Sequence, residues 1–317
     1  MIDRYGRELY YLRLSVTELC NMRCRYCMPA EGVCKLRHEE MLTEDEIVRA
    51  VRAAASLGMY KVRITGGEPL VKPTILSVCR RVAEVEGVTE TVLTTNATRL
   101  AALARPLREA GIRRVNISLD TLSAEKYAFM TRGGVLADAM NGIEAALEAG
   151  FEKVKINAVL IGGFNDDEIP ALADLTRRRP VDMRFIELMP MPGDTLFGEH
   201  AYIPVSRVLE MLPEAEPTAE HDGVAQMYRL PGGLGNIGLI SPLSNHFCGN
   251  CNRLRLTADG HLKPCLHSRE EICIKGMNEE QMAEAIRQAA LLKPRQHDPL
   301  SRSERSHAAR PMNQIGG

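Results

Sequence analysis

The sequence predicts an α/β protein built on a partial (β/α)6 TIM-like barrel with a smaller C-terminal α+β region. Six short runs of strand-forming residues alternate with helical stretches, and each helix is long enough to connect two parallel strands. A loop with three cysteines follows the first strand, and barrels of this kind carry their sites at the carboxyl ends of the strands. Six units are two short of a closed eight-stranded barrel.

The elements of the predicted barrel follow one another with short connections. A capping box of Thr43 and Glu46 opens the first helix, which ends at Gly58, and Gly111 and Gly150 end two later helices. The predicted strands are residues 12–16, 61–65, 90–95, 114–118, 153–160 and 182–188. The predicted helices are residues 43–58, 74–85, 100–110 and 168–178, with two more between 124 and 149.

The alternation stops after Pro190, where residues 191–194 read as a turn-rich linker. We therefore expect one domain over residues 1–190 and a second over residues 191–317. The second region is predicted to contain helices at 203–212 and 279–292, a strand at 225–230, a glycine-rich turn at 231–238 and a hairpin of 254–257 with 261–263.

Composition narrows the classes of function. A formal net charge of -1 over 317 residues argues against a globally basic nucleic-acid binder, and the absence of tryptophan disfavours a base-stacking surface. The first residues carry charges throughout, with no apolar stretch for an export signal or membrane span, so we expect a cytoplasmic protein. Nine cysteines in such a protein favour metal binding over disulfides.

The first cysteine group is Cys20, Cys24 and Cys27, three thiols within eight residues. Three thiolates can hold three irons of a cubane cluster and leave the fourth iron open for chemistry. The alternative is a structural zinc site, which usually closes with a fourth nearby ligand, and His38 is the only histidine that follows soon after.

A second group, Cys248, Cys251 and Cys265, again supplies three thiols. A Cys3His zinc site is a competing interpretation here, because three histidines lie close by in sequence: His246, His261 and His267. Arg253 and Arg255 stand between these thiols on a predicted strand and so point to one face, where guanidinium groups favour bidentate capture of phosphate. We expect an anionic substrate beside an incompletely ligated metal.

The C-x-x-x-C-x-x-C spacing with Tyr26 before the third cysteine resembles the signature of the radical S-adenosylmethionine (SAM) enzymes. The run Ile64-Thr65-Gly66-Gly67-Glu68-Pro69 at the end of a predicted strand is similar to the motif that holds the SAM amino group in that superfamily. The resemblance implies that SAM chelates the open iron and is cleaved to methionine and a 5'-deoxyadenosyl radical, so that the cofactors carry the difficult step.

A longer set of motifs narrows the resemblance: LRLSVTELCNMRCRYCMP, KVRITGGEPL, LTTN, VNISLD, FCGNCNRLRLTADG, PCL and a final Gly-Gly. Together they resemble the GTP 3',8-cyclases of molybdenum cofactor biosynthesis, the MoaA family. The resemblance implies a lyase in which the radical removes the 3' hydrogen of GTP and the ribose closes onto C8 of guanine. The implied product is (8S)-3',8-cyclo-7,8-dihydroguanosine 5'-triphosphate.

The resemblance also implies roles for single residues. Two [4Fe-4S] clusters would be held by Cys20, Cys24, Cys27 and by Cys248, Cys251, Cys265. SAM would be contacted by Tyr26, Gly67, Ser118 and Met189. GTP would be contacted by Arg13, Arg63, Thr94, Lys155, Arg253, Arg255 and Thr257, with Lys61 and Arg184 as further candidates. Gly316 and Gly317 would reach into the active site and take part in catalysis.

The implied partners are GTP, an external electron donor and, downstream, the cyclic pyranopterin monophosphate synthase; a homodimer is implied by the resemblance only. The sequence assigns no role to Cys34, Cys79 or Cys273. The nearest rival is a radical SAM enzyme that modifies peptides with the help of auxiliary clusters, and a zinc-stabilised nucleotide-binding protein is the rival from another class.

Overall fold

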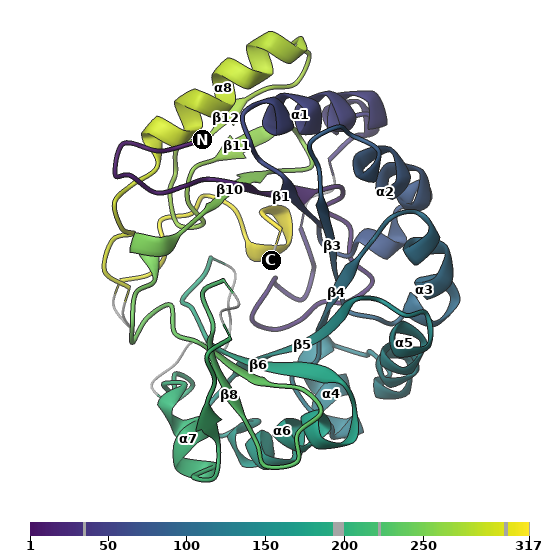
Figure 1. The fold of residues 1–317 in the computed structure, drawn as a ribbon, viewed down its shortest axis with the longest axis vertical. Coiled ribbons are helices and arrows are strands. Elements are labelled where there is room, and N and C mark those ends of the chain that lie inside the picture. The colour runs from purple at the N-terminus through teal and green to yellow at the C-terminus, as the bar shows by residue number, and fades with distance from the viewer. Residues whose placement is uncertain (34–35, 193–199, 221–222, 301–303, 317) are drawn as a thin grey trace.

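The strands of this protein form one continuous sheet that curls into an open barrel, as the computed structural model in Figure 1 shows. The structure describes residues 1–33, 36–192, 200–220, 223–300 and 304–316. Across these residues the sheet has twelve strands in the order β12-β11-β10-β1-β2-β3-β4-β5-β6-β9-β8-β7. The first six strands in sequence occupy its centre, and the later strands extend both of its edges.

The central strands are parallel and alternate with helices that cover the outside of the barrel (Figure 1). The strands are β1 (Tyr11–Ser15), β2 (Lys61–Thr65), β3 (Glu90–Thr95), β4 (Arg114–Ser118), β5 (Lys153–Leu160) and β6 (Val181–Glu187). The helices are α1 (Glu44–Ser56), α2 (Ile75–Ala83), α3 (Leu100–Glu109), α4 (Ala124–Thr131), α5 (Leu136–Glu148) and α6 (Ile169–Arg178). Every predicted element of the barrel is present, and the predicted (β/α)6 arrangement is confirmed.

The C-terminal strands join the barrel directly. On one side β10 (Arg253–Leu256) pairs in parallel with β1, which sets Arg255 beside Arg13. On the other side β9 (Ile237–Ile240) pairs in parallel with β6. The remaining strands pair in antiparallel fashion: β7 (Glu216–Pro217), β8 (Gln226–Arg229), β11 (His261–Lys263) and β12 (Ile272–Cys273).

Strand β9 differs from the sequence-based prediction, which assigned residues 231–238 to a glycine-rich turn. The strand already begins at Ile237, and Gly238 is part of it. A Cβ on Gly238 would lie only 3.1 Å from Cγ of Arg184 on the neighbouring strand. The glycine therefore makes room for an arginine side chain, and its presence in a strand reflects this close approach.

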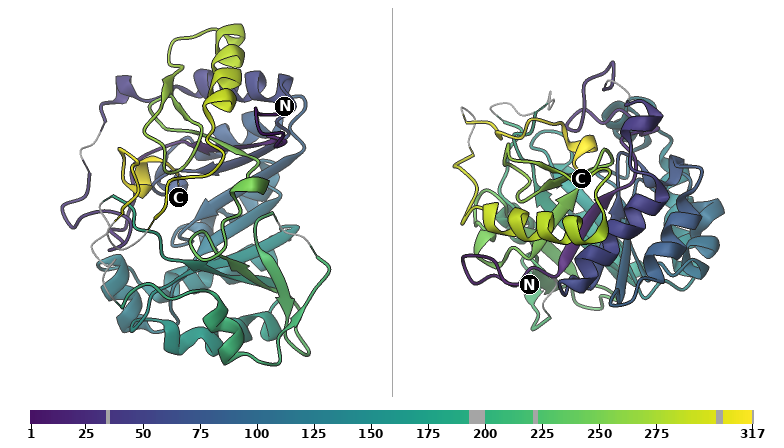
Figure 2. Two further views of the ribbon diagram at one scale, coloured as in Figure 1. Left: turned by 90° about the vertical axis from the view of Figure 1, so that its left-hand side faces the viewer. Right: turned by 90° about the horizontal axis from the view of Figure 1, so that it is seen from above.

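Two helices and several short 3₁₀ turns complete the described chain. Helix α7 (Ser206–Met211) lies near α6, and α8 (Glu279–Leu292) packs beside α1 (Figure 2). The 3₁₀ turns are His38–Glu40, Pro69–Val71, Asp166–Glu168, Cys248–Asn250 and Met312–Gln314. Helix α8 begins at a capping box of Asn278 and Gln281, so its predicted range is confirmed.

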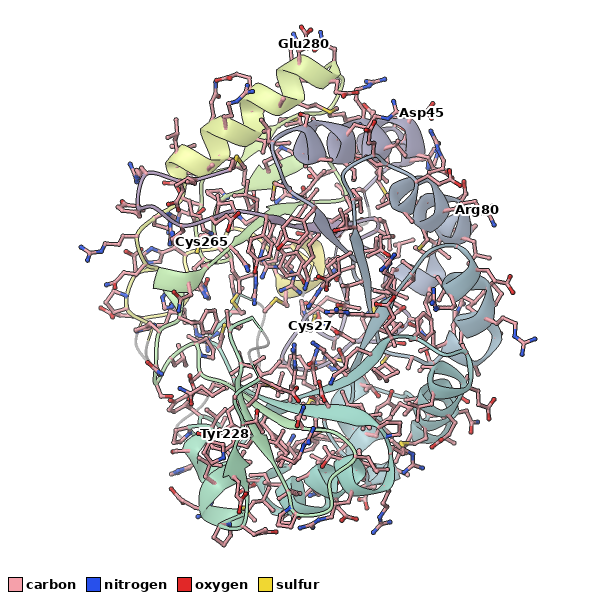
Figure 3. The ribbon with its side chains drawn as sticks, in the orientation of Figure 1. Cys27, Asp45, Arg80, Tyr228, Cys265 and Glu280 are labelled. Atoms are coloured by element: carbon pink, nitrogen blue, oxygen red, sulfur yellow. The ribbon has the colours of Figure 1, made fainter. Side chains whose placement is uncertain are left out.

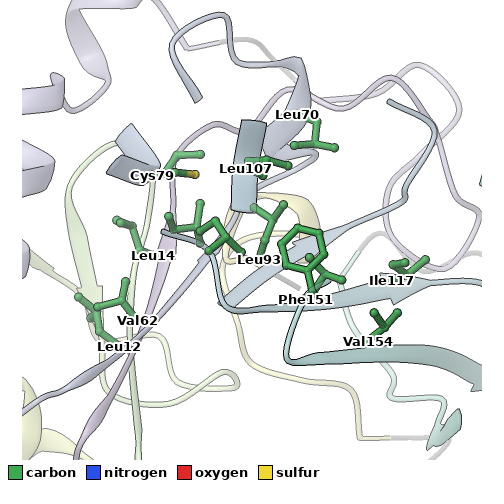
Figure 4. Close-up of a cluster of buried hydrophobic side chains, with 14 of the residues drawn as sticks. Leu12, Leu14, Val62, Leu70, Cys79, Leu93, Leu107, Ile117, Phe151 and Val154 are labelled. Atoms are coloured by element: carbon green, nitrogen blue, oxygen red, sulfur yellow. The ribbon is translucent and has the colours of Figure 1, made fainter. Parts of the chain in front are cut away.

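The two faces of the barrel strands have opposite character. The outward side chains are apolar and pack under the helices; Figure 4 shows members of this core, such as Leu12, Val62, Leu93 and Ile117. Because successive side chains point to opposite faces, the residues between them point into the barrel. In β1 and β2 those inward residues include Arg13 and Arg63, so the interior of the barrel is polar and strongly basic.

Candidate active site

A cavity of about 340 Å³ lies at the mouth of the barrel and is lined by both cysteine groups. Figure 3 shows Cys27 near the centre of the molecule and Cys265 beside β10. The predicted site residues in its lining are Arg13, Cys20, Cys24, Tyr26, Cys27, Arg63, Gly67, Thr94, Ser118, Arg184, Met189, Cys248, Cys251, Arg253, Arg255 and Cys265. Pairing of β10 with β1 thus brings the two cysteine groups to one cavity although more than half of the sequence separates them.

The first cysteine loop leaves the carboxyl end of β1 and is held by the end of helix α4. The backbone N–H of Arg23 donates to the carbonyl of Thr131 at 3.1 Å, and that of Arg25 donates to Met130 at 3.0 Å. Arg132 adopts a left-handed conformation with a φ of 57° and donates from its guanidinium to the carbonyl of Arg23. These contacts fix the path of the loop independently of its cysteines.

Burial raises the pKa of all three thiols of this loop, to about 11 for Cys20, to about 12 for Cys27 and also upward for Cys24. Neighbouring thiols add to the effect, since a second thiolate nearby disfavours the first. A bound metal reverses this balance, because a coordinating thiol is deprotonated outright. The set of three partly buried thiols at one cavity fits a cubane cluster, in which each thiolate binds its own iron.

Gly67 lies against the start of the cysteine loop. Its N–H donates to the carbonyl of Thr17 at 2.8 Å, and a Cβ at this position would lie 2.5 Å from the carbonyl oxygens of Glu18 and Leu19. No side chain fits there without moving backbone, so glycine is required by the close approach of the two loops. The Gly-Gly motif therefore packs directly beside the residues that precede Cys20.

Glu68 ties this loop to the end of the next strand. The buried carboxylate accepts hydrogen bonds from Thr95 Oγ1 at 2.7 Å and from the N–H groups of Asn96 and Leu70 at 2.7 and 3.0 Å. Burial nevertheless outweighs these bonds and raises the pKa of Glu68 to about 7. Glu68 thereby positions the strand end that carries Thr94.

Asp120 links the cysteine loop to the end of β4 and was not singled out from the sequence. Tyr26 Oη donates to one carboxylate oxygen at 2.9 Å, and the N–H of Val159 donates to the other at 2.9 Å. Burial raises the pKa of Asp120 to about 6. Its position two residues after Ser118, at the carboxyl end of a barrel strand, could have indicated Asp120 from the sequence.

Six cations point into the barrel from five strands: Arg13, Arg63, Lys155, Arg184, Arg253 and Arg255. Burial, together with a smaller effect of neighbouring arginines, lowers the pKa of Arg184 to about 10, of Arg255 to about 10 and of Lys155 to about 6. Burial and nearby arginines also lower the pKa of Arg13. The lowered pKa values show that these positive charges are disfavoured by burial and mutual repulsion. A bound polyanion would offset both effects, so the site attracts one.

Carboxylates at the amino ends of the strands neutralise a different set of bases. Glu90 pairs with Lys61 at 2.6 Å and with Arg114 at 2.9 Å, and Asp182 pairs with Lys153 at 3.0 Å. Lys61, a further candidate for substrate contact, is therefore engaged in an ion pair at the bottom of the barrel. The net positive charge is left near the cavity.

The second cysteine group lies on the opposite side of the cavity, next to β10. Burial raises the pKa of Cys248. For Cys251 burial acts in the same direction, but the positive charges of Lys293 and Arg253 and a hydrogen bond from Lys293 outweigh it, so its pKa is lowered. Three thiols facing the same cavity, one of them already biased toward thiolate, fit a second cluster.

The histidines near this group have other partners. His261 Nδ1 lies 3.1 Å from Asp259, and His267 Nδ1 is hydrogen-bonded to Ser306 at 2.9 Å. The ring of His246 stacks edge-on against His297 at 4.7 Å. In the part of the chain that the structure describes, no three His, Cys, Asp or Glu side chains gather to hold a single metal ion. His267 and His297 line the same cavity as the three thiols, so metal analysis separates a zinc site from a cluster.

The segment before the C-terminus enters the barrel mouth, as the yellow segment near the C label in Figure 1 shows. Arg255 donates to the carbonyls of Ile315 at 3.1 Å and Gly316 at 2.5 Å. Gly316 is buried with a φ of +70°, and a Cβ there would lie 2.6 Å from Cγ2 of Thr65. Gly317 lies outside the described residues.

The structure does not bring every predicted residue to the cavity wall. Lys155 is buried below it on β5, and Thr257 is fully buried with its hydroxyl hydrogen-bonded within the β10–β11 turn. Of the cysteines without a role, Cys79 is in the core and Cys273 is exposed, while Cys34 and residues 193–194 of the predicted linker lie outside the described residues.

The sequence reasoning also missed Arg7 and Lys293, which contact the second cysteine group. Arg7 donates to the carbonyl of Cys248 at 2.9 Å, and Lys293 lines the cavity. The buried position of both residues has no local signal, since a base in a polar loop usually faces solvent.

Among the described residues, no helix has the length and apolar character needed to cross a membrane.

Comparison with solved structures agrees with the barrel fold. The chain is similar to Streptococcus suis SuiB bound to the precursor peptide SuiA, with a TM-score of 0.65 and 16% identity over 89% of this chain and 67% of that one. It is also similar to anSMEcpe with bound AdoMet, with a TM-score of 0.57 and 14% identity over 86% of this chain and 77% of that one. At these identities the likeness concerns the fold alone.

Family models and curated relatives are more specific. Residues 14–176 match the radical SAM superfamily, and residues 181–299 match the family Molybdenum Cofactor Synthesis C. The GTP 3',8-cyclases of Alkaliphilus oremlandii and Pelotomaculum thermopropionicum are each 46% identical to this chain, over the full length of both proteins. That of Moorella thermoacetica is also 46% identical over the full length of both. The chain therefore belongs to the radical SAM superfamily and, within it, to the GTP 3',8-cyclase family.

Proposed function

We propose that this protein is a radical SAM lyase that converts GTP to (8S)-3',8-cyclo-7,8-dihydroguanosine 5'-triphosphate, the first step of molybdenum cofactor biosynthesis. The observation that carries the proposal is the shared cavity, which is lined by both cysteine groups and by arginines of the barrel interior. A radical reaction on a nucleotide needs a cofactor site and an anion site in contact, and this cavity provides both.

In this proposal Cys20, Cys24 and Cys27 hold one [4Fe-4S] cluster and Cys248, Cys251 and Cys265 hold a second. With a cluster and SAM bound, the site would supply a 5'-deoxyadenosyl radical for removal of the 3' hydrogen of GTP. The protein holds the cysteine loop through α4 and keeps its thiols partly buried at the cavity.

The residues proposed to bind SAM lie around the first cysteine group. They are Tyr26, Gly67, Ser118 and Met189, and all four line the cavity. Gly67 presents backbone rather than a side chain, which suits contact with the amino or carboxylate group of SAM. Asp120 orients Tyr26 through its hydroxyl and belongs to the same wall of the cavity.

The residues proposed to bind GTP come from several strands, so they would contact the triphosphate from more than one side. They are Arg13, Arg63, Thr94, Lys155, Arg253, Arg255 and Thr257, with Arg184 as a further contact. Guanidinium groups suit this task because they bind phosphate oxygens in bidentate fashion. Thr257 has hydrogen-bonding partners in its own turn, so its proposed role is the one that the geometry supports least.

The proposed division of the chain places the radical chemistry in residues 1–190 and the second cluster, with its share of GTP binding, in residues 191–317. The C-terminal tail takes part in catalysis through Gly316 and Gly317. The tail is supported in this role by the bonds from Arg255 to the carbonyls of Ile315 and Gly316. A backbone without side chains can approach a ligand closely in a narrow cavity.

Reductive cleavage of SAM consumes an electron, so we propose an external electron donor. We further propose that the product passes to the cyclic pyranopterin monophosphate synthase, that the protein acts in the cytoplasm and that it forms a homodimer. These four points extend the family assignment and are open to direct test by pull-down, fractionation and light scattering.

The test of the function is anaerobic reconstitution with iron and sulfide, followed by incubation with dithionite, SAM and GTP. The expected result is about eight irons per chain, from two four-iron clusters, with GTP-dependent 5'-deoxyadenosine and a cyclised nucleotide. SAM cleavage with GTP untouched would overturn the substrate but retain the radical SAM barrel. Iron for one cluster together with zinc would overturn the second cluster.

A further inference from the structure

Lys293 is a buried lysine beside the second cysteine group. It follows the last residue of α8, lines the cavity and is only 2% exposed. Its ammonium donates to the carbonyls of Arg253 at 2.9 Å and Pro264 at 2.8 Å. These carbonyls belong to the chain that follows Cys251 and the chain that precedes Cys265, so Lys293 lies between the two cysteine-bearing strands of the hairpin.

The groups near Lys293 that can become anionic are thiols. A hydrogen bond joins it to Cys251, and its charge also acts on Cys248. Arg253 adds a second positive charge to the same place. Among the described residues, no carboxylate forms an ion pair with Lys293. Burying an ammonium group among neutral partners costs free energy unless an anion lies close by. A negatively charged group beside Lys293 would therefore be stabilised.

Arg7 holds the same region but through neutral groups. Its guanidinium donates to the carbonyls of Cys248 at 2.9 Å, Pro294 at 2.7 Å and Arg295 at 3.0 Å. Its charge is balanced by Asp3, whose carboxylate lies 2.6 Å from Nε. Arg7 therefore fixes the position of the loops, whereas the charge of Lys293 is directed at the thiols.

We propose that Lys293 is the charged hydrogen-bond donor that stabilises the second cluster and raises its reduction potential. This inference rests on the proposed function, since it assumes a cluster on Cys248, Cys251 and Cys265. A cubane core held by three thiolates is a net anion, and one-electron reduction makes it more negative. A fixed cation at a ligand sulfur therefore favours the reduced state, because net charge and hydrogen bonds to sulfur set the potential of such clusters.

Three substitutions separate the charge from the architecture. Lys293→Gln removes the charge but keeps an amide that can donate to the two carbonyls, and Lys293→Met removes charge and donor together. Lys293→Arg keeps the charge. Arg7→Met combined with Asp3→Asn is the matched control, because it loosens the same loops but removes a mutually balanced pair of charges, so the net charge near the thiols is unchanged.

Two measurements on the anaerobically reconstituted protein follow. The first is the rate at which a chelator removes iron from the holoenzyme. The second is a dithionite titration followed by electron paramagnetic resonance, in a background in which Cys20, Cys24 and Cys27 are replaced by alanine, so that only the second cluster is observed. Thermal unfolding of each variant reports whether it is folded.

The expected result is a lower potential in whichever of Lys293→Gln and Lys293→Met folds, with iron released roughly 10- to 100-fold faster. Lys293→Arg is expected to keep the parent potential. The double variant with Arg7→Met and Asp3→Asn is expected to release iron faster at an unchanged potential. An unchanged potential in the folded neutral Lys293 variants, or an equal shift in the double variant, would overturn the proposal.

The proposed function fails differently. If the parent protein binds iron for one cluster only, with zinc on the second cysteine group, the second cluster itself is wrong and Lys293 is a counter-ion to a zinc site. If the parent protein binds both clusters and the variants match it, the cluster stands and the role of Lys293 is overturned.

Discussion

Lys155 is a single buried base whose protonation state should change when its ligand binds. It lies on β5 with its side chain toward the barrel interior, where burial and the charge of Arg184 lower its pKa to about 6. At neutral pH the side chain is therefore mostly neutral in the empty protein. A triphosphate nearby favours the ammonium form, so binding should be accompanied by uptake of a proton.

The prediction is that GTP affinity falls as pH rises above about 6, and that binding at neutral pH takes up a proton. The sign follows because the bound state holds more protons than the free state above the pKa of the free protein. Isothermal titration calorimetry in buffers of different ionisation enthalpy, without SAM, measures the uptake. In Lys155→Met the uptake should disappear and the affinity should fall.

Lys153 provides the control for this residue. It lies on the same face of the same strand, but it is partly exposed and pairs with Asp182 at 3.0 Å. Lys153→Met should leave the proton uptake unchanged. Equal uptake in the parent protein and in Lys155→Met would mean that another group takes the proton, and Lys155 would lose its proposed role in GTP binding.

The same linkage has an opposite consequence for stability. Unfolded Lys155 stays protonated up to the ordinary range of a lysine, whereas in the folded protein it loses its proton near pH 6. Between these values the unfolded chain binds more protons than the native one. The contribution of Lys155 to the free energy of unfolding therefore rises with pH across this window in the absence of ligand.

At the scale of an element, a partly buried ion-pair network anchors the C-terminal tail. Arg310 donates to both carboxylate oxygens of Glu271 at 3.0 Å and to Asp259 at 2.7 Å. Lys263 also pairs with Glu271, at 2.8 Å. These residues belong to the β10–β11–β12 region, so the network fastens the tail to the hairpin that carries part of the second cysteine group.

The tail also touches the first cysteine loop. The Asn313 side chain donates to the carbonyl of Glu18 at 3.2 Å, and its backbone N–H is hydrogen-bonded to the thiol of Cys27. Gln314 donates to the carboxylate of Glu18 at 3.3 Å. The segment from Arg310 to Gly316 therefore spans the distance between the two cysteine groups, and a shift at its anchor should be felt at the active site.

We predict that Arg310→Leu lowers formation of the cyclised nucleotide by on the order of 100-fold, because displacement of a positioned segment by an ångström can cost that much. Iron content should be unchanged, since Arg310 contacts no cysteine. Product formation is measured by chromatography after incubation with SAM, GTP and dithionite.

Arg269→Leu is the matched control, because within the described part of the chain Arg269 makes an exposed hydrogen bond to the carbonyl of His307 and no ion pair. It should retain nearly full activity. Wild-type product formation in Arg310→Leu would show that the tail is held by other contacts, with Arg255 as the first candidate.

At the scale of the whole molecule, the two cysteine groups lie on separate supports although they share a cavity. The first is held by the end of α4, and the second by β10, Arg7 and Lys293. Loss of one group should therefore leave the backbone of the other in place. The reaction that remains after loss of one cysteine group should therefore differ from the reaction that remains after loss of the other.

We predict that Cys248→Ser reduces the iron content by about half and abolishes cyclisation, while dithionite still drives SAM cleavage at the first site. The 5'-deoxyadenosine yield and the iron content are measured on the same reconstituted sample. Cys273→Ser, at an exposed cysteine outside both groups, should change neither quantity. If Cys248→Ser also abolished SAM cleavage, the two sites would depend on each other.

Much of the barrel was predictable because its signals are local. The strand at residues 61–65 and the helix at 279–292 occur as predicted, since alternation of apolar side chains and capping residues act over a few positions. The strand at Ile237–Ile240 was not predicted, because its glycine imitates a turn. The glycine is explained by the close packing of Arg184, Met227 and Ala225 around it, and the contact with Arg184 is remote in sequence.

The candidate site was predictable in its residue types but not in all of its members. Cysteine spacing and the motifs around it indicated the thiols, and most of the residues carried over from the family line the cavity. Asp120, Arg7 and Lys293 were missed because each acts through a buried contact with a residue distant in sequence. Thr257 is the reverse case, because its place in the family motif implied a contact with the ligand. In the structure its hydroxyl is hydrogen-bonded to the carbonyl of His261 in the same turn.

The sequence by itself determined the βα alternation, the two sets of thiols and the family to which they point, because periodicity, capping and cysteine spacing are properties of neighbouring residues. The tertiary structure decided that β10 pairs with β1 and that both cysteine groups, the interior arginines and the tail meet at one cavity. Pairing of strands far apart in sequence depends on how whole faces pack. No short stretch of the chain carries that information.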